Sequence, residues 1–445
     1  MRGTARTMLT EVKLDNFRIF GKEVIFRLRP ITVLIGENSA GKSSFIKFLL
    51  MLQQSLAASE AGFLEPEGEK VHLGAFVDLR NSVAKRPFLG FQLKFRTGDI
   101  PPLVERKMLE AVQQGNLQLD PVTQRGELHI RVERVETLTQ READEAEYEV
   151  RAKVPYSSKR RSGFHAVKAT LNGDPLFSQL SRNLRETQFL RFSFASTMET
   201  TESLKHFFTD RYLRPLRGEI RSWRHLSAIR EESQRAIVTS SPPARDVGQM
   251  GEYAMPHLQR IINEGGEEAR FVLRHMASVL EIENLRFESS MKGYLAHCYC
   301  TNSKTKAEVF LSDFGFGVSQ CIPIFVQGAL MRDQQLLLIE QPEAQLHPSA
   351  QIEMGTFFAE LWKERRVMSI VETHSSQIIL RLRRLIALGK LLAADVSIAY
   401  VYVDDQGVPS VKNLDVDSSG NLEKGLPMEF FGADVLESMK LGLKR

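Results

Sequence analysis

Residues 31–45 read ITVLIGENSAGKSSF, which predicts a buried strand, a glycine-rich turn and the start of a helix. The stretch fits the pattern G-x-x-x-x-G-K-[ST], with Gly36 and Gly41 as the two glycines, followed by Lys42 and Ser43. Phosphate groups need many short donors, and a turn without Cβ atoms supplies them from its backbone N–H groups. We therefore expect a phosphate-binding loop here.

The residues of this loop have distinct expected roles toward a nucleoside triphosphate. The helix that begins near Gly41 adds about half a positive charge at its N-terminus. Lys42 would reach the β- and γ-phosphates, and the Ser43 hydroxyl would ligate Mg²⁺. The pattern arises by chance in a chain this long with a probability of about 0.02. The predicted nucleotide-binding residues are Gly36, Glu37, Asn38, Ser39, Ala40, Gly41, Lys42, Ser43 and Ser44.

The bulk composition is that of a globular protein with more than one domain. The chain has 445 residues, of which 42% are hydrophobic and 26% are charged. Its 59 basic residues are nearly balanced by 55 acidic ones, so the net charge of +4 does not by itself indicate nucleic-acid binding. We expect no membrane association, because no apolar run approaches the ~20 residues of a membrane span.

The cysteines and the N-terminus predict a cytoplasmic location. Cys298, Cys300 and Cys321 are the three cysteines, and no second Cys/His pair stands at zinc spacing. Neither a disulfide framework nor a structural zinc site is therefore expected, which fits a reducing compartment. The first ten residues also lack the apolar core of a signal peptide.

Periodicity divides the chain into three parts. Residues 101–222 differ in character from the parts before and after them, so we predict an inserted α+β subdomain there. Strands are expected from apolar alternation and helices from 3.6-residue periodicity. The expected strands are 9–20, 23–29, 71–81, 88–95, 126–135 and 147–154, with three more within 281–311; the expected helices are 44–56, 176–208 and 255–280.

The segment 211–235 is rich in arginine, with seven arginines against three glutamates. A phosphate-binding surface is one interpretation, and it would allow DNA binding. Salt-bridged helix and strand faces are the other. Only Tyr212 and Trp223 interrupt the arginines as aromatic residues, whereas single-stranded nucleic-acid sites usually combine basic and stacking side chains.

Carboxylates follow a second buried strand. Residues 336–339 are LLLI and lead into Glu340-Gln341-Pro342-Glu343. In a parallel sheet the carboxyl ends of the strands face the ligand crevice. A carboxylate at that end can support Mg²⁺, which makes Glu340 the candidate for this role. The next apolar strand, 367–371, ends before His374, whose side chain could reach a γ-phosphate.

A third motif precedes the carboxylate strand. Gly315, Gly317, Ser319 and Gln320 lie in the sequence GFGVSQ, which opens an apolar helix. Glycines and a serine at a helix start form an anion-binding geometry. The chain therefore carries two separate ends that could bind phosphate.

The order of these motifs resembles the ABC-type ATPase heads of the SMC, RecF and OLD (overcoming lysogenization defect) proteins. The opening sequence VKLDNFRIF and the run E-Q-P-E-x-x-L-H-P make the chain most similar to bacterial stand-alone AAA/ABC ATPases. The resemblance covers residues 8–100 and 223–445. It implies an α/β P-loop NTPase fold of ABC-ATPase type, a mixed sheet flanked by helices, with the insertion at 101–222.

The resemblance also implies a mechanism with ATP and Mg²⁺ as cofactors. The signature of one subunit, Gly315, Gly317, Ser319 and Gln320, would complete the ATP site of a second subunit, giving a homodimer or a higher homo-oligomer. Ser43 and Glu340 would support the metal, and His374 would be the switch histidine. Residues 344–347 would form the D-loop, whereas Gln53 and Gln54 lie on the wrong element to form the Q-loop.

One departure from the family bears on catalysis. ABC ATPases usually have Asp-Glu at this strand end, whereas this chain has Glu340-Gln341. Glutamine can orient water but cannot accept its proton, and a positioned base contributes about 10²–10⁴-fold. We therefore predict slow turnover, with Glu343 either the substitute base or a surface carboxylate beside a turn. His347, before Pro348, is expected to be structural.

The resemblance leaves several biological roles open. The leading hypothesis is a sensor or clamp in prokaryotic anti-phage defence or DNA maintenance, acting with a separately encoded effector such as a nuclease or toxin. Asp404, Asp405, Asp415 and Asp417 could suggest metal ligands, but the tail beyond residue 396 is too short for a nuclease domain. A scaffold with little turnover and a transporter ATPase subunit are the alternatives.

Overall fold

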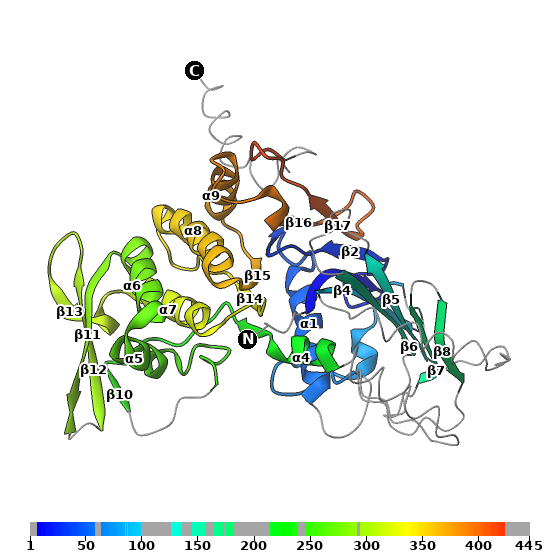
Figure 1. Cartoon of the computed structure of the whole chain (residues 1–445), viewed down its shortest axis with the longest axis horizontal. Coiled ribbons are helices and arrows are strands. Elements are labelled where there is room, and N and C mark those ends of the chain that lie inside the picture. Colours follow the sequence, from blue (N-terminus) through cyan, green and yellow to red (C-terminus); the bar gives the residue numbers. More distant parts are fainter. Residues whose placement is uncertain are drawn as a thin grey trace. The chain divides into compact units, whose positions relative to one another are not determined.

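The computed structural model describes residues 7–57, 64–84, 86, 88–98, 126–135, 145–155, 164–171, 174–180, 214–238, 245–291 and 294–422. The chain divides into two compact units, and Figure 1 labels many of their helices and strands. The first unit comprises residues 1–28, 38–222 and 401–412. The second comprises residues 29–37, 223–400 and 413–445.

Parallel strands that end at one edge are the centre of the second unit. Four neighbours run parallel in the order β3 (Ile31–Gly36), β15 (Met368–Glu372), β14 (Leu336–Glu340) and β9 (Arg224–Leu226). β16 (Val396–Val403) and β17 (Pro409–Leu414) complete this six-stranded sheet. β3 and β15 are buried along their whole length, as near-continuous apolar runs require in a parallel sheet. The strands predicted at 336–339 and 367–371 are confirmed.

A seven-stranded, mainly antiparallel sheet forms most of the first unit. Its order is β2 (Val24–Arg27), β1 (Thr7–Asp15), β4 (Phe88–Gly98), β6 (Glu145–Pro155), β5 (Gly126–Val135), β7 (Phe164–Leu171) and β8 (Asp174–Leu180). The strands predicted near 88, 126 and 147 are confirmed. The helix predicted at 176–208 is wrong for residues 176–180, because these residues pair with β7. The rest of that segment lies outside the described residues.

A layer of phenylalanines joins helix α1 (Lys42–Ala57) to this sheet. Phe45 stacks on Phe26 of β2 with ring centroids 3.9 Å apart. Phe48 meets Phe17 and Phe91 edge-on at 5.4 Å and 5.3 Å. Offset and edge-on ring pairs stabilise a core beyond the area they bury. The predicted helix at 44–56 is confirmed, and its apolar faces are explained by burial on several sides.

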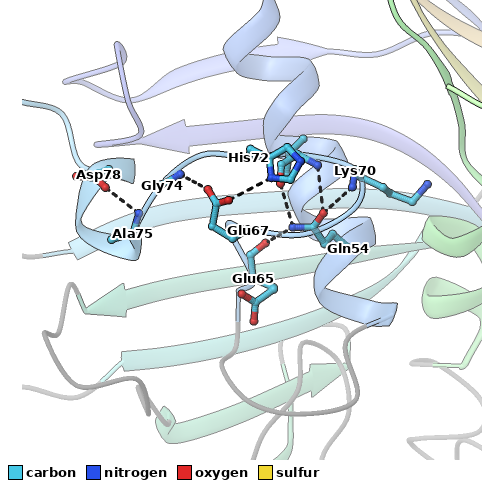
Figure 2. Close-up of polar contacts among 9 residues, drawn as sticks. Gln54, Glu65, Glu67, Lys70, His72, Gly74, Ala75 and Asp78 are labelled. Carbon is cyan, nitrogen blue, oxygen red and sulfur yellow. Dashed lines mark hydrogen bonds and ion pairs between the residues drawn. The ribbon is translucent and has the colours of Figure 1, made fainter. Parts of the chain in front are cut away.

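The segment after α1 corrects one prediction. Residues 71–81 were expected to form a strand, yet they form a loop that ends in a short 3₁₀ helix, η1 (Phe76–Leu79). Gln54, a buried side chain of α1, binds the backbone at the start of this loop (Figure 2). Its amide donates to the carbonyl of Glu65 at 2.9 Å and accepts from the N–H groups of Lys70 and Val71 at 2.9 Å and 3.1 Å. A helix side chain thus satisfies backbone groups that a neighbouring strand would otherwise pair.

Helices and a small sheet complete the structure. The helices are α4 (Arg214–Ser222), α5 (Ala254–Glu264), α6 (Gly266–Leu280), α7 (Phe316–Leu330), α8 (Pro348–Arg365) and α9 (Ser376–Ala387), with 3₁₀ turns η4 (Leu311–Asp313) and η5 (Ala393–Asp395). The small sheet contains β10 (Ala236–Val238), β12 (Leu295–Asn302), β11 (Ile282–Ser290) and β13 (Glu308–Phe310). The three strands expected within 281–311 are confirmed.

Two of these helices replace one predicted helix. The periodicity of 255–280 indicates a single helix, but the chain breaks between α5 and α6. Gly265 and Gly266 have positive φ angles of 69° and 84°, which glycine adopts without the steric cost of a side chain. None of the helices in the described ranges is both long enough and apolar enough to cross a membrane.

Candidate functional site

The phosphate loop has the backbone that its glycines predict. φ is 137° at Gly36, where β3 ends, and 123° at Gly41, directly before α1. A Cβ atom on Gly41 would lie 2.5 Å from Cζ of Phe20, so the position excludes any side chain. Ser39 is also left-handed, with φ 62°. Helix α1 begins at Lys42, so its first N–H groups follow the turn immediately.

Exposure differs along the loop. Glu37, Asn38 and Ser39 are exposed, whereas Ala40, Gly41 and Lys42 are buried. Ser43 and Ser44, in the first turn of α1, are half-buried. The exposed tip and the buried start of the helix are the arrangement that a phosphate-binding loop requires, because its donors point out from a fixed base.

A histidine on the neighbouring strand β9 binds the carboxylate at the end of β14. Glu340 ends β14 and is in register with Glu372, which ends β15. Nε2 of His225, on β9, lies 2.8 Å from Oε1 of Glu340 and donates to it, and Nδ1 of the same ring lies 3.3 Å from the amide of Gln249. The His225 side chain is 5% exposed and that of Glu340 is 18% exposed. The ring therefore fixes one carboxylate oxygen and leaves Oε2 of Glu340 without a partner among the described residues.

Residues 340–346, here called the carboxylate loop, turn sharply after β14. Gln341 is left-handed, with φ 45°, and its N–H donates to the carbonyl of Glu372 at 2.7 Å. Further turns follow, from Ala344 N–H to the Gln341 carbonyl at 3.2 Å and from Leu346 N–H to the Glu343 carbonyl at 3.0 Å. The backbone thus anchors Gln341 at the sheet edge, while its half-buried side chain makes no hydrogen bond within the described part of the chain.

Glu343 is placed by the segment that carries the predicted switch histidine. Its Oε1 accepts a hydrogen bond from the main-chain N–H of His374 at 2.7 Å. Its Oε2 is buried and has no protein partner among the described residues. Buried polar atoms are nearly always hydrogen-bonded, so an orphaned carboxylate oxygen indicates a place for water, a cation or another ligand. His374 itself is exposed.

Residues 315–320, here called the signature turn, combine an exposed start with a buried end. Gly315 has φ 117° and precedes α7, and Phe316 is 47% exposed. A Cβ atom on Gly317 would lie 2.8 Å from the carbonyl oxygen of Gln345, so only glycine fits against the carboxylate loop. Ser319 is buried and its hydroxyl accepts from Ser233 N–H at 3.0 Å.

Gln320 binds an arginine that the sequence motifs do not include. Its amide accepts from Arg230 N–H at 3.3 Å and donates to the Arg230 carbonyl at 3.1 Å. The Arg230 guanidinium donates to the Gln320 carbonyl at 3.3 Å and to the Glu340 carbonyl at 2.6 Å. Arg230 is 2% exposed, and burial lowers its pKa to about 10 against the opposing charges of Cys321, Glu343 and Glu340.

Sequence analysis missed the roles of His225 and Arg230. Both lie in the run His225-Leu226-Ser227-Ala228-Ile229-Arg230, which begins two residues after the buried Trp223. A histidine within a buried strand and an arginine a few residues beyond its end were the available signal.

Other arginines of 211–235 follow the salt-bridge interpretation. Arg224 pairs with Asp246 at 2.9 Å, and Arg235 pairs with Asp313 at 2.6 Å. Arg221 donates to the carbonyl of Leu56 at 3.1 Å. Gln53 and Gln54 are likewise occupied by backbone groups, since Gln53 donates to the carbonyl of Ile220 at 3.0 Å. Both glutamine side chains therefore bind backbone groups of their own subunit.

Several remaining side chains have local structural roles. His347 caps α8, accepting from Ser349 N–H at 3.3 Å, as expected of a structural residue. Asp404 accepts from Val408 N–H, Asp415 pairs with Arg29 at 2.9 Å, and Asp417 accepts from Asn421 N–H. Within the residues that the structure describes, no three His, Cys, Asp or Glu side chains converge as a metal cage. The three cysteines are free and buried.

Two segments of the chain match a known family of ATPase domains. Residues 8–85 and 249–379 match the family model of the AAA ATPase domain AAA_15. This match confirms the predicted ATPase head and its P-loop α/β fold. No curated protein matches the chain.

The chain also resembles solved structures of SMC head domains, at low sequence identity. They include the SMC head domain from Thermotoga maritima, at 10% identity and a TM-score of 0.38, with 92% of this chain and 100% of that one covered. The Smc head bound to the C-terminal domain of ScpA from Pyrococcus furiosus has 12% sequence identity and a TM-score of 0.39. The match covers 98% of this chain and 100% of that one. An SmcHead bound to the C-winged helix domain of ScpA has 12% sequence identity and a TM-score of 0.41. The match covers 93% of this chain and 99% of that one.

Proposed function

We propose that this chain, which carries an AAA-type ATPase domain, binds ATP with Mg²⁺ at residues 36–44 and hydrolyses it slowly, with Glu343 as the general base. The observation that carries the proposal is the state of Glu343. One of its oxygens is fixed by His374 N–H, and the other is buried without a partner in the described structure. A positioned carboxylate with one available oxygen is what a general base needs in order to take a proton from water.

The residues at this sheet edge fit a magnesium ion bound mainly through nucleotide phosphates. Mg²⁺ takes oxygen ligands and is commonly held by one or two protein groups together with substrate phosphates, so a protein cage is unnecessary. Oε2 of Glu340 is available because His225 occupies only Oε1. Ser43 and Glu340 would hold the ion, which would neutralise charge that develops on the phosphates.

Gln341 and Glu343 would divide the handling of the attacking water. The Gln341 amide can orient a water molecule but cannot accept its proton, whereas a carboxylate can do both. The Gln341 backbone is pinned to Glu372 at 2.7 Å, which keeps its side chain at the end of β14. We therefore expect Gln341 to affect orientation and Glu343 to affect the proton-transfer step.

The test is steady-state phosphate release measured together with ATP affinity. Glu343→Gln should lower kcat by about 10²–10⁴-fold, because the isosteric amide keeps the bond from His374 but cannot take a proton. ATP affinity should change little. Glu353→Gln is the matched control, since Glu353 pairs with Arg381 at 3.4 Å on α8 and has no role in the site. An unchanged kcat in Glu343→Gln would reject Glu343 as the base.

We further propose that two copies bind ATP between them, with the signature turn of one copy reaching the nucleotide of the other. The exposed Gly315 and Phe316 at the start of α7 support this, because helix N-termini attract phosphate. Ser319 and Gln320 are buried and bonded within their own subunit, so their part would be to hold the turn. Light scattering with ATP, with ADP and without nucleotide tests it: a mass that does not depend on nucleotide counts against the dimer.

For the biological role, we propose a nucleotide-gated sensor or clamp in anti-phage defence or DNA maintenance, with a separately encoded nuclease or toxin as effector. The resemblance of the motif order to SMC, RecF and OLD heads supports it. The three buried free cysteines fit a cytoplasmic location. DNA binding is the accompanying expectation, and salt-dependent DNA retention with and without ATP tests it. Co-purification with a permease would instead favour the transporter subunit.

A further inference from the structure

Arg230 connects two parts of the candidate site that are far apart in the sequence. On one side it is bound to Gln320, with both its main-chain groups and its guanidinium engaged. On the other side the same guanidinium donates to the carbonyl of Glu340 at 2.6 Å. A single side chain therefore joins the first turn of α7 to the last residue of β14.

Burying the charged side chain of Arg230 costs folding free energy. Within the described residues, no carboxylate lies within ion-pair distance of the guanidinium, and its buried Nε has no hydrogen-bond partner. Burying a cation that is not paired costs several kcal/mol. An apolar side chain would fill the same space without that cost. The bonds to two carbonyl groups are what a guanidinium provides and an apolar residue cannot, because its planar fork fixes two acceptors relative to each other.

Three further contacts involve these two parts: one joins them directly, and two join them separately to the segment 225–233. Ser233 N–H donates to the Ser319 hydroxyl at 3.0 Å, which fixes the segment after Arg230 to α7. A Cβ atom on Gly317 would lie 2.8 Å from the Gln345 carbonyl oxygen, so the signature turn also packs directly on the carboxylate loop. His225, on the strand that precedes Arg230, holds the Glu340 side chain at 2.8 Å. The segment 225–233 thus contacts both the Glu340 carboxylate and the signature turn.

We propose that Arg230 is a positioning residue that locks the signature turn and the carboxylate loop into one geometry, so that displacement of either one moves the other. The proposal rests on the proposed ATPase function. It adds that hydrolysis depends on the state of the signature turn through a contact inside the same subunit. Loss of Arg230 should then weaken turnover without weakening nucleotide binding.

The first test separates binding from turnover. In Arg230→Gln, kcat should fall by about 10- to 100-fold, because a displacement of about 1 Å in a catalytic group can cost that much. The Kd for ATP should stay within about twofold. Arg230→Lys keeps a cation but lacks the planar fork that fixes two acceptors relative to each other, so it should show the same pattern with a smaller loss. An Arg230→Gln enzyme with wild-type kcat, or with kcat and ATP affinity reduced in parallel, would overturn the proposal.

Arg365 provides the matched control, because its guanidinium also binds backbone carbonyl groups of α7, at the opposite end of the helix. Its guanidinium donates to the carbonyls of Gly328 at 3.1 Å and Met331 at 3.3 Å and also to that of Ala329. Arg365→Gln should lower stability but leave kcat within about twofold of wild type below the unfolding transition. An equal fall of kcat in Arg365→Gln and Arg230→Gln would overturn the proposal, because any loss of anchoring of α7 would then suffice.

The second test needs no turnover and therefore stands apart from the proposed function. Hydrogen exchange is measured for peptides covering 315–320 and 340–346 in each variant. Arg230→Gln should reduce protection in both peptides together, by about tenfold, although the substitution lies in neither. Loss of protection in only one of them, or in neither, would overturn the lock. If the wild-type protein fails to bind or hydrolyse ATP, the proposed function fails while this readout still decides the coupling.

Discussion

Replacing Gly41 by alanine tests whether the phosphate loop is as tightly enclosed as the structure indicates. The new Cβ atom would lie 2.5 Å from Cζ of Phe20 and 2.9 Å from Cγ2 of Ile19. The Phe20 ring cannot move aside easily, because it is fully buried and packs edge-on against Phe26 with centroids 5.9 Å apart. The substitution should therefore both strain the backbone and overpack the core.

The expected cost has two parts. A positive φ costs a residue with a side chain about 1–2 kcal/mol, and overpacking costs about 1–3 kcal/mol. Gly41→Ala should thus lower the free energy of unfolding by about 2–5 kcal/mol. Gly389→Ala isolates the first part, because Gly389 has φ 66° and no atom within 4 Å of the added Cβ. Its cost should be about 1 kcal/mol.

Urea unfolding of the two variants, with fluorescent-ATP binding measured alongside, checks this reasoning. Gly41→Ala should have the lower midpoint and should lose ATP affinity, since the loop must move to relieve the contact. Gly389→Ala should bind ATP as the wild type does. Equal midpoints for the two variants would show that the space around Gly41 can open freely, which would refute the steric argument.

Three further predictions concern buried polar groups. Gln54→Met removes the amide partner of Lys70 N–H and Val71 N–H, so it should cost about 2–4 kcal/mol and increase hydrogen exchange in residues 65–72. Burial raises the pKa of Cys300 to about 11 and of Cys321 to about 12. Both thiols should resist a thiol reagent at pH 8 until unfolding, and stability should fall as pH rises from about 8.5 towards these values, because only the unfolded thiols ionise there. Burial, aided by the charge of Arg274, lowers the pKa of His275 to about 3, although Glu360 lies 3.4 Å away. Stability should fall as pH drops from about 6.5 towards 3, because the unfolded histidine is protonated first, and His275→Phe should remove that slope in urea titrations at pH 5 and pH 7.5.

The parts of the structure that were predictable are those set by local chemistry. A loop whose glycines need positive φ angles at Gly36 and Gly41 has few sequence solutions, so the motif identified it directly. Short apolar runs that end in carboxylates predict the buried strands 336–340 and 368–372. Both kinds of signal lie within about ten residues of sequence.

The parts that were missed depend on long-range contacts. Nothing near Val71 shows that the amide of Gln54, on another element, satisfies its backbone. In the same way, the partner of His225 is Glu340, far along the chain, and the partner of Arg230 is Gln320. A single sequence shows that such polar side chains exist in apolar surroundings. It does not show which distant atoms they meet.

An arginine side chain donates to backbone carbonyl groups at each end of helix α7, Arg230 near its start and Arg365 near its end. Because each residue added to or removed from a helix rotates everything beyond it by about 100°, the number of residues between Gln320 and Gly328 is constrained even where their identities are not. Conservative apolar exchanges inside this stretch should be tolerated. A single-residue deletion there should move one end of α7 out of reach of its arginine. If that end is the one bound to Arg230, turnover should fall as it does in Arg230→Gln.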